Sequence, residues 1–87
     1  MAKIEKLFKL SEAEIKILLY LLQHERAYIR ELTSKLGISP ATVQKSVEIL
    51  SNLELVRILR EDRRKYLYLT QKGERVAKKY RQIARML

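Results

Sequence analysis

The sequence predicts an α+β fold that is mainly helical and carries one small β-hairpin. Apolar residues recur at helical spacing up to Asn52, alternate with polar ones between Val56 and Leu69, and return to helical spacing afterwards. Within the first part, only four residues, Gly37 to Pro40, separate two helical patterns. That short connection is typical of a helix-turn-helix motif, around which the other elements are expected to pack.

The first elements are an N-terminal segment and a well-marked helix. Residues 1–10 carry charges and helically spaced apolar side chains, which predicts an arm or a short helix. A longer helix is predicted to begin at Ser11, because Ser11 and Glu14 have the spacing of a capping box. Its apolar stripe consists of Ile15, Leu18, Leu19 and Leu22, broadened by Ile17 and Leu21.

The helix-turn-helix motif is predicted from caps as well as from periodicity. Leu32 and Leu36 share one helical face, and Gly37 follows as a C-cap that can adopt positive φ. Ser39 and Pro40 then provide an N-cap oxygen and a fixed φ for the second helix, 40–51. The apolar stripe of that helix is Val43, Val47 and Leu50. Residues 27–29 are predicted to form a short extended piece before the motif.

Two alternating runs after the motif predict a β-hairpin. Val56, Ile58 and Arg60 are expected to point to one face, and Arg57 and Leu59 to the other. The second run, 66–69, follows the polar residues 61–64. Because no glycine marks the turn, we expect a loop of four residues rather than two.

The last helix is expected to cover 71–87, with Thr70 as its cap, and to contribute to a dimer. Its apolar residues repeat at a 4-3-4 spacing, which is typical of a seam between helices. The seam can pack on its own domain or on a partner helix, and we expect a homodimer. The predicted interface residues are Val76, Tyr80, Ile83, Ala84 and Leu87. With no linker or repeat visible, 1–87 is expected to be one domain with an arm (1–10), a core (11–70) and a C-terminal helix (71–87).

Composition excludes several classes of function. The chain has no cysteine and one histidine, His24, so no zinc site, other metal site or cofactor is expected. No serine lies in a nucleophile–base pattern, so the chain is not expected to be an enzyme. No apolar run is long enough to span a membrane and no signal peptide is visible, so a cytoplasmic, nucleoid-associated protein is expected.

The charge of the chain points to a polyanion. Its net charge is +9. Residues 1–38 hold seven Lys/Arg and five Asp/Glu (net +2), whereas residues 39–87 hold twelve and five (net +7). Basic surface of this density, in the same half as the second helix of the motif, suggests double-stranded DNA as the partner.

Four segments resemble winged-helix regulators of the MarR and TrmB type. LSEAEIKILLYLL resembles their first helix, ELTSKLGISPATVQKSVEIL their helix-turn-helix, and LELVRILREDRRKYLYLT their wing. LTQKGERVAKKY is similar to the Leu-Thr-x-x-Gly start of their final helix. The resemblance covers about Leu10 to Tyr80 and implies a DNA-binding transcriptional regulator with a winged-helix fold. Glu54 and Ser46 depart from it, because the family usually has glycine and a larger apolar residue there.

The resemblance implies that helix 40–51 enters the major groove and that the wing approaches the minor groove. Opposite its apolar stripe, Gln44 can bond adenine, Lys45 can reach guanine or phosphate, and Ala41 or Thr42 can touch a thymine methyl. Ser39 is expected to act mainly as a cap. The predicted DNA-binding residues are Ser39, Pro40, Ala41, Thr42, Gln44, Lys45, Arg30, Arg60, Arg63, Arg64 and Lys65.

Three functions remain open at this point. The first is a dimeric, sequence-specific transcriptional regulator with no evident small-molecule effector. The second is an architectural protein that binds DNA with little base preference, which the diffuse charge would also support. The third is a protein-interaction module. The ratio of specific to random DNA binding separates the first two. Tyr66 and Tyr68 on the outer face of the wing can serve packing or a contact with the DNA backbone.

Overall fold

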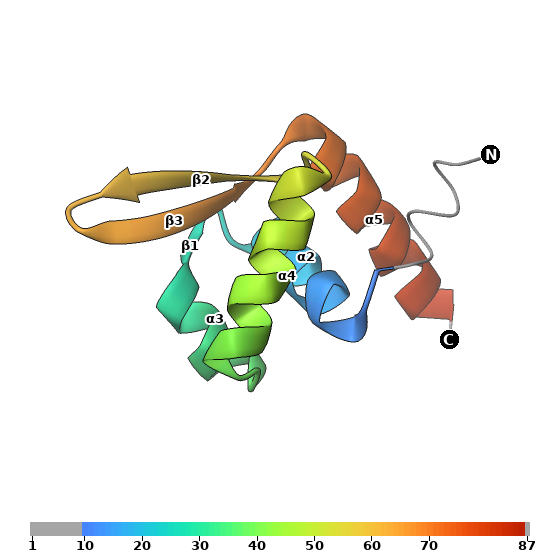
Figure 1. The fold of residues 1–87 in the computed structure, drawn as a ribbon. Coiled ribbons are helices and arrows are strands. Elements are labelled where there is room, and N and C mark those ends of the chain that lie inside the picture. Colours follow the sequence, from blue (N-terminus) through green and yellow to red (C-terminus); the bar gives the residue numbers. More distant parts are fainter. Residues whose placement is uncertain (1–9, 87) are drawn as a thin grey trace.

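The computed structural model describes residues 10–86 and confirms the predicted α+β class. The elements are α2 (Glu12–Gln23), β1 (Ala27–Tyr28), α3 (Ile29–Leu36), α4 (Pro40–Asn52), β2 (Val56–Glu61), β3 (Arg64–Leu69) and α5 (Gln71–Met86) (Figure 1). The predicted arm over 1–10 lies outside the described residues except for Leu10, which is buried. The helices form a body from which the β2–β3 hairpin projects, while α5 lies at the opposite end (Figure 1).

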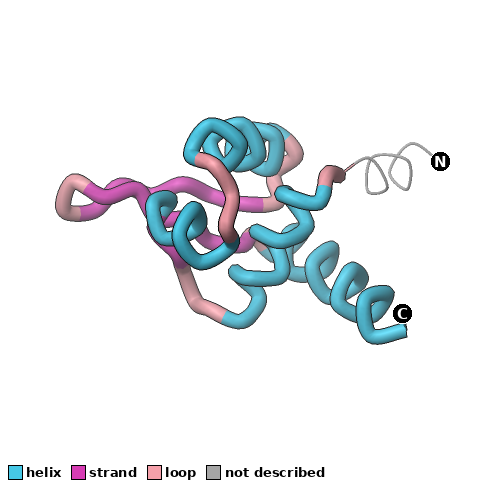
Figure 2. The backbone as a smooth tube through the Cα atoms, turned by 90° about the horizontal axis from the view of Figure 1, so that it is seen from below, coloured by secondary structure: helices cyan, strands magenta, loops and turns pink. Residues whose placement is uncertain are grey.

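The sheet has three strands rather than the two that the sequence predicted. Its order is β1-β3-β2, and both pairs are antiparallel. The expected extended piece forms β1, which pairs with β3 through Ala27 opposite Leu67 and Tyr28 opposite Tyr66. Figure 2 shows the two long strands running out from the helices to the hairpin turn. The third strand joins the hairpin directly to the start of α3.

The hairpin turn contains two residues, so the expected four-residue loop is wrong. Glu61 and Arg64 are paired strand residues, which leaves only Asp62 and Arg63 between β2 and β3. Their φ angles are +47° and +68°. Positive φ at both central residues characterises type I′ turns, whose twist matches that of the flanking strands. Aspartate tolerates this conformation, but arginine adopts it only with strain, so a two-residue turn at these positions could not be predicted from residue type.

The caps of the helix-turn-helix motif are confirmed. Gly37 follows α3 with φ +63°, and its N–H donates to the Thr33 carbonyl oxygen at 3.1 Å. The Ser39 hydroxyl accepts from the Thr42 N–H at 3.2 Å, and Pro40 occupies the first turn of α4. At the start of α3, the Glu31 carboxylate accepts from the Tyr28 N–H at 3.1 Å. These local bonds define both ends of α3 and the start of α4.

The core lies between α2, the helix-turn-helix and the inner ends of the strands. The centre of the α2 stripe is shifted from the predicted one: Ile17, Leu18 and Leu21 are buried, whereas Leu19 and Leu22 are only half-buried. The predicted stripe of α4 is confirmed. The buried apolar residues are Leu10, Ile17, Leu18, Leu21, Ala27, Leu32, Val43, Val47, Leu50, Leu55, Val56, Leu67, Val76 and Ala77.

The strands of the wing alternate as predicted, but few of their side chains are buried. In β2 only Val56 is buried, and in β3 only Leu67. Ile58 and Leu59, on opposite faces of β2, remain 42% and 46% exposed. The hairpin is therefore anchored by packing at its base and extends into solvent beyond it.

A tight corner connects α4, the wing and α5. The Thr70 hydroxyl accepts from the Gly73 N–H at 2.9 Å, confirming Thr70 as the cap of α5, and donates to the Glu54 carbonyl oxygen at 2.7 Å. A Cβ on Gly73 would lie 1.9 Å from the Leu55 carbonyl oxygen, so only glycine fits. Glu54 has φ +61°, which explains why the resembling family usually has glycine there.

Candidate nucleic-acid interface

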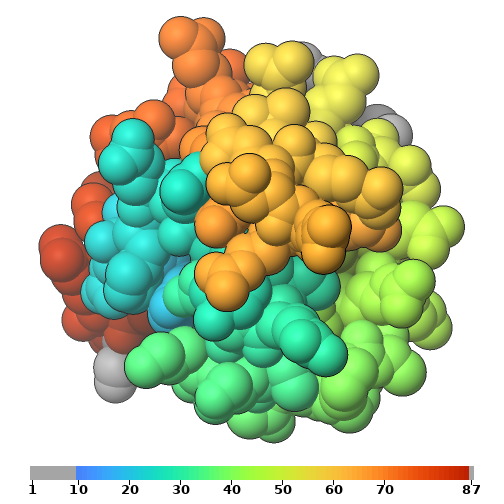
Figure 3. Space-filling view, turned by 90° about the vertical axis from the view of Figure 1, so that its left-hand side faces the viewer, coloured from blue at the N-terminus to red at the C-terminus, as the bar shows by residue number. Residues whose placement is uncertain are grey.

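A concave groove separates the wing from the helix-turn-helix motif. Its basic lining residues outnumber its acidic ones by six to two, the acidic ones being Glu31 and Asp62. Figure 3 shows this end of the molecule, with the orange wing above the teal and green helices of the motif. The basic lining residues are Arg30, Lys35, Arg60, Arg63, Arg64 and Lys65. This concentration of cations in one concavity creates a positive potential suited to a phosphate backbone.

The structure brings seven of the eleven predicted DNA-binding residues to this groove. Besides Arg30 and the four cations of the wing, they include Pro40 and Gln44 at the start of α4. The other four do not line the groove but are also exposed, at or just after the start of α4: Ser39, Ala41, Thr42 and Lys45. The apolar stripe of α4 faces the core, so its polar face is available to a ligand.

The wing cations lie on two faces of the hairpin. Arg60 is paired with Lys65, and both lie on the same face of the hairpin as the pair Ile58 and Leu67, of which Leu67 is buried. Arg64 is paired with Glu61 and points to the opposite face, where its guanidinium carbon lies 5.0 Å from the centroid of the Tyr28 ring. Side chains directly opposite each other in an antiparallel pair share a face. Arg63 occupies the turn itself, so it is the outermost of these cations.

A buried polar link between α2 and the exposed α4 was missed by sequence reasoning. The Ser46 hydroxyl donates to a Glu14 carboxylate oxygen at 2.7 Å, and both residues are buried. Glu14 also accepts from the Ser11 N–H at 3.0 Å and from the Ser11 hydroxyl, which confirms the predicted capping box. Ser46, which departs from the pattern of the resembling family, is thus a hydrogen-bond partner of this carboxylate.

The environment of Glu14 lowers its pKa. Burial alone would raise the pKa, but hydrogen bonds from Ser11 and Ser46 to the carboxylate outweigh it and hold the pKa below its ordinary value. The ionised carboxylate is thus the stable form inside the body. It holds the middle of α4 against the start of α2, which fixes the orientation of the face that α4 presents to solvent.

The predicted dimer residues of α5 are divided between the core and solvent. Val76 is buried in its own chain, and Tyr80 is half-buried against the core. Burial raises the pKa of the Tyr80 hydroxyl, which has no hydrogen-bond partner among the described residues. Ala84 is exposed and Ile83 is 45% exposed, whereas Leu87 lies outside the described range. Met86, which was not among the predicted interface residues, is 82% exposed in the same turn of α5.

Residues 10–86 contain neither a cluster of metal ligands nor a helix that could span a membrane. No cluster of three potential metal ligands occurs among them, although the acidic residues Glu31 and Asp62 line one groove. None of their helices combines the length and apolar character that crossing a membrane requires.

The order of elements defines a winged-helix domain. The chain belongs to the TrmB family, because the family model described as "Sugar-specific transcriptional regulator TrmB" matches residues 5–83. This match confirms the resemblance to TrmB-like regulators that the sequence suggested. No curated protein matches the chain.

Solved structures of bacterial regulators have the same fold. A mutant of ZitR from Lactococcus lactis has 31% sequence identity and a TM-score of 0.79, covering 85% of this chain and 52% of its own. AdcR, the adhesin competence repressor of Streptococcus pyogenes, has 25% identity and a TM-score of 0.83, covering 90% of this chain and 58% of its own. The chain thus spans about half the length of the ZitR chain it matches. The heme sensor PefR of Streptococcus agalactiae, at 22% identity, shares the fold.

Proposed function

We propose that this domain is a DNA-binding transcriptional regulator that holds one phosphate backbone in the groove between its wing and α4. The observation that carries the proposal is the clustering of six basic side chains from α3, β2, β3 and the hairpin turn in a single groove. A duplex placed there meets the exposed face of α4 in its major groove and the wing tip near its minor groove. Membership of the TrmB family supports the same function.

Base contacts are proposed for the polar face of α4. Gln44 can bond adenine N6 and N7 together, and Lys45 can reach guanine or a phosphate. Ala41 and Thr42 lie one turn earlier and offer methyl groups to thymine. Ser39 caps α4, so its hydroxyl acts mainly within the protein.

Wing contacts are proposed mainly for Arg63, since the turn places it beyond the paired strands. Narrow minor grooves of A·T-rich DNA concentrate negative potential and attract an inserted arginine. Arg60, Lys65 and Arg30 line the groove beneath and are suited to phosphates, which position the duplex without reading its sequence.

A homodimer is proposed through the end of α5. Ile83, Ala84 and Met86 form an exposed apolar continuation of the seam that Val76 and Tyr80 begin inside the domain. Two copies related by a two-fold axis would present their α4 helices to successive major grooves, about 34 Å apart on one duplex face.

Fluorescence anisotropy with random and selected duplexes tests the proposal. We expect affinity for random DNA to fall steeply as salt rises, since phosphate neutralisation releases counterions. Selection from a random library is expected to give a near-palindromic site. The double variant Gln44→Ala/Lys45→Ala should relax that preference. Binding that is weak and insensitive to salt would refute DNA binding, whereas strong binding without any preference would favour an architectural role.

A further inference from the structure

Packing does not determine the direction of the wing, so other contacts must hold it. From Arg57 to Lys65 every side chain is exposed, so no burial fixes the outer half of the hairpin. A two-stranded ribbon with no buried face is only marginally stable in its own right. Its cations can face α4 across the groove reproducibly only if other contacts hold it.

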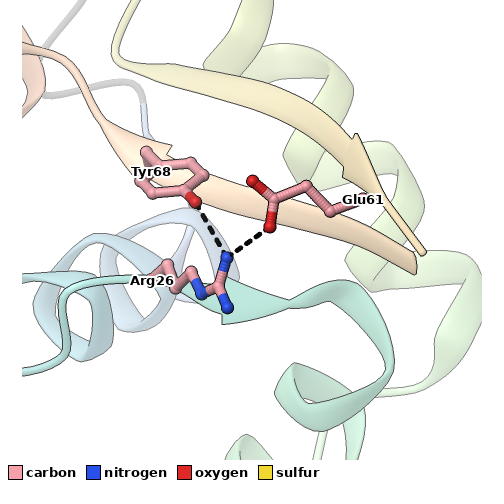
Figure 4. Close-up of polar contacts among 3 residues, drawn as sticks. All are labelled: Arg26, Glu61 and Tyr68. Atoms are coloured by element: carbon pink, nitrogen blue, oxygen red, sulfur yellow. Dashed lines mark hydrogen bonds and ion pairs between the residues drawn. The ribbon is translucent and has the colours of Figure 1, made fainter. Parts of the chain in front are cut away.

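Arg26 makes three such contacts from outside the hairpin. It lies in the loop between α2 and β1, and its Nη1 donates to the Glu61 carboxylate at 2.7 Å and to the Tyr68 hydroxyl at 3.1 Å (Figure 4). Its guanidinium carbon lies 3.9 Å from the centroid of the Tyr66 ring. These hydrogen bonds raise the pKa of Arg26, the bond to Tyr68 contributing most. One side chain therefore bridges the base of the wing and its last paired residue before the turn.

Tyr28 continues the contact along the same face. Its ring meets the Tyr66 ring edge-on with centroids 6.2 Å apart, and the Arg64 guanidinium carbon lies 5.0 Å from the centroid of the Tyr28 ring. The segment 26–28 leads directly into α3, whose first turn contributes Arg30 to the groove. The wing is consequently fastened to the same segment that begins the helix-turn-helix motif.

We propose that Arg26 is a positioning residue that pins the wing over the groove and thereby sets how well DNA is bound. The inference rests on the proposed function. Arg26 acts through Glu61, Tyr66 and Tyr68, on the face of the hairpin opposite to that of Arg60 and Lys65. Its effect on binding is therefore transmitted by the direction of the wing.

A variant of Glu61 distinguishes the positioning role of Arg26 from an effect of net charge on DNA affinity. Removal of an acidic side chain from a DNA-facing wing should strengthen binding if net charge alone decides affinity. If Glu61 is the anchor of Arg26, its removal should weaken binding instead. The neighbouring Asp62 provides the control, since it forms no ion pair in the described part of the chain. The variant Asp62→Asn removes the same charge and retains tolerance of positive φ.

The first arm of the experiment measures affinity for a selected duplex in the variants Arg26→Ala, Glu61→Ala, the double variant and Asp62→Asn. We expect each single alanine variant to bind up to about fivefold more weakly, the range of an exposed ion pair. The double variant should be no weaker than Arg26→Ala, and Asp62→Asn should bind as well as the original chain or better. Tighter binding by Glu61→Ala, or losses that multiply in the double variant, would overturn the proposal.

The second arm measures the wing without DNA. Since the chain has no cysteine, Ser34→Cys on α3 and Lys65→Cys on β3 provide two unique sites for spin labels across the groove. We expect the distribution of label distances to broaden in Arg26→Ala and to stay narrow in Asp62→Asn. An unchanged distance distribution in Arg26→Ala would contradict the proposal that Arg26 positions the wing. If the chain bound no DNA, the proposed function would fail while this arm still decided the role of Arg26.

Discussion

The helical body and the wing are held in place by different forces. In the body, side chains from four helices and the inner ends of the strands are buried together, and Glu14 is fully hydrogen-bonded among them. In the wing, only Val56 and Leu67 are buried, and a strained two-residue turn and the contacts of Arg26 determine the rest. Burial fixes where α4 lies, whereas turn geometry and exposed polar contacts fix where the wing cations lie.

The helical body and the wing should respond differently to salt. Salt screens buried contacts much less than exposed ones, so the face that α4 presents should change little as salt varies. Exposed ion pairs are screened, so the direction of the wing should vary more with salt than that of α4. Changes in the body should therefore appear as lost stability, and changes in the wing as lost binding with stability retained.

The largest loss of stability is expected from Gly73→Ala. The new methyl group would lie 1.9 Å from the Leu55 carbonyl oxygen, so the corner between α4, the wing and α5 must open. We expect the free energy of unfolding to fall by about 3 kcal/mol, as for severe overpacking. Urea unfolding measures it. The matched control is Gly37→Ala, where φ is +63° but nothing lies within 4 Å, and about 1 kcal/mol should be lost. Equal losses at both glycines would contradict the close approach at Gly73.

An intermediate effect is expected at Glu14. Its pKa is lowered in the folded protein, so its contribution to stability is present above the ordinary pKa of 4.5 and is lost as pH falls through the lower folded value. The variant Glu14→Gln keeps the shape and the capping-box pattern but cannot titrate. Below pH 4.5, stability should therefore decline more steeply in the original chain than in Glu14→Gln. Urea unfolding across this pH range measures the stability of both proteins. If stability fell equally with pH in both, the protonation of Glu14 would not be coupled to folding.

Removal of the buried hydroxyl tests the same link from α4. In Ser46→Ala the carboxylate loses one donor inside the core, which should reduce the free energy of unfolding by about 1–2 kcal/mol. Circular dichroism during thermal unfolding would detect this loss. Ser51→Ala, a half-buried serine on the same helix, provides the comparison.

Substitutions of Arg63 in the hairpin turn should weaken DNA binding without lowering the stability of the domain. In Arg63→Gly the strain of positive φ is relieved, so the hairpin should be unchanged or more stable by up to about 1 kcal/mol. Loss of the outermost cation should nevertheless weaken DNA binding and reduce the salt slope by about 1. Arg63→Asn also removes the charge but tolerates the turn, and it should bind like Arg63→Gly. Full affinity in both variants would exclude Arg63 from the interface.

The smallest effect on stability is expected at the end of α5. Ile83 and Met86 are largely exposed, so Ile83→Glu/Met86→Glu should change the free energy of unfolding by less than about 0.5 kcal/mol. If they form the dimer interface, the same variant should be monomeric by light scattering while the original chain is dimeric. Val76→Ser, which alters a buried residue, should instead unfold the domain more readily. A persistent dimer in the double variant would exclude this seam.

Features encoded by neighbouring residues were predictable from the sequence. The caps at Ser11, Gly37, Ser39 and Thr70 depend on residues within one turn of each other, and all four are observed. Together with the apolar periodicity, these caps predicted the helix-turn-helix, and the helical period placed Gln44 on an exposed face. Arg30 was predicted to contact DNA from its position at the start of the motif, and the structure brings it into one groove with the wing cations.

Features that depend on distant pairs were not predictable. The bond from Ser46 to Glu14 joins residues 32 positions apart, and the contact of Arg26 with Glu61 joins residues 35 apart. No periodicity encodes either pair. The turn at Asp62–Arg63 was missed for another reason: its positive φ angles are normally signalled by glycine, which is absent. The pairing of β1 was missed because a two-residue strand has no pattern of its own.

The most direct test of whether DNA binds in the groove between the wing and α4 compares two sets of charge removals by fluorescence anisotropy. The groove variant Arg30→Ala/Arg60→Ala/Lys65→Ala and the control Arg75→Ala/Lys79→Ala/Arg85→Ala on exposed positions of α5 each remove three positive charges. The groove predicts a strong loss of affinity and a salt slope reduced by up to about 3 for the first variant only. Equal losses in both variants would show that net charge, rather than the groove between wing and α4, holds the DNA.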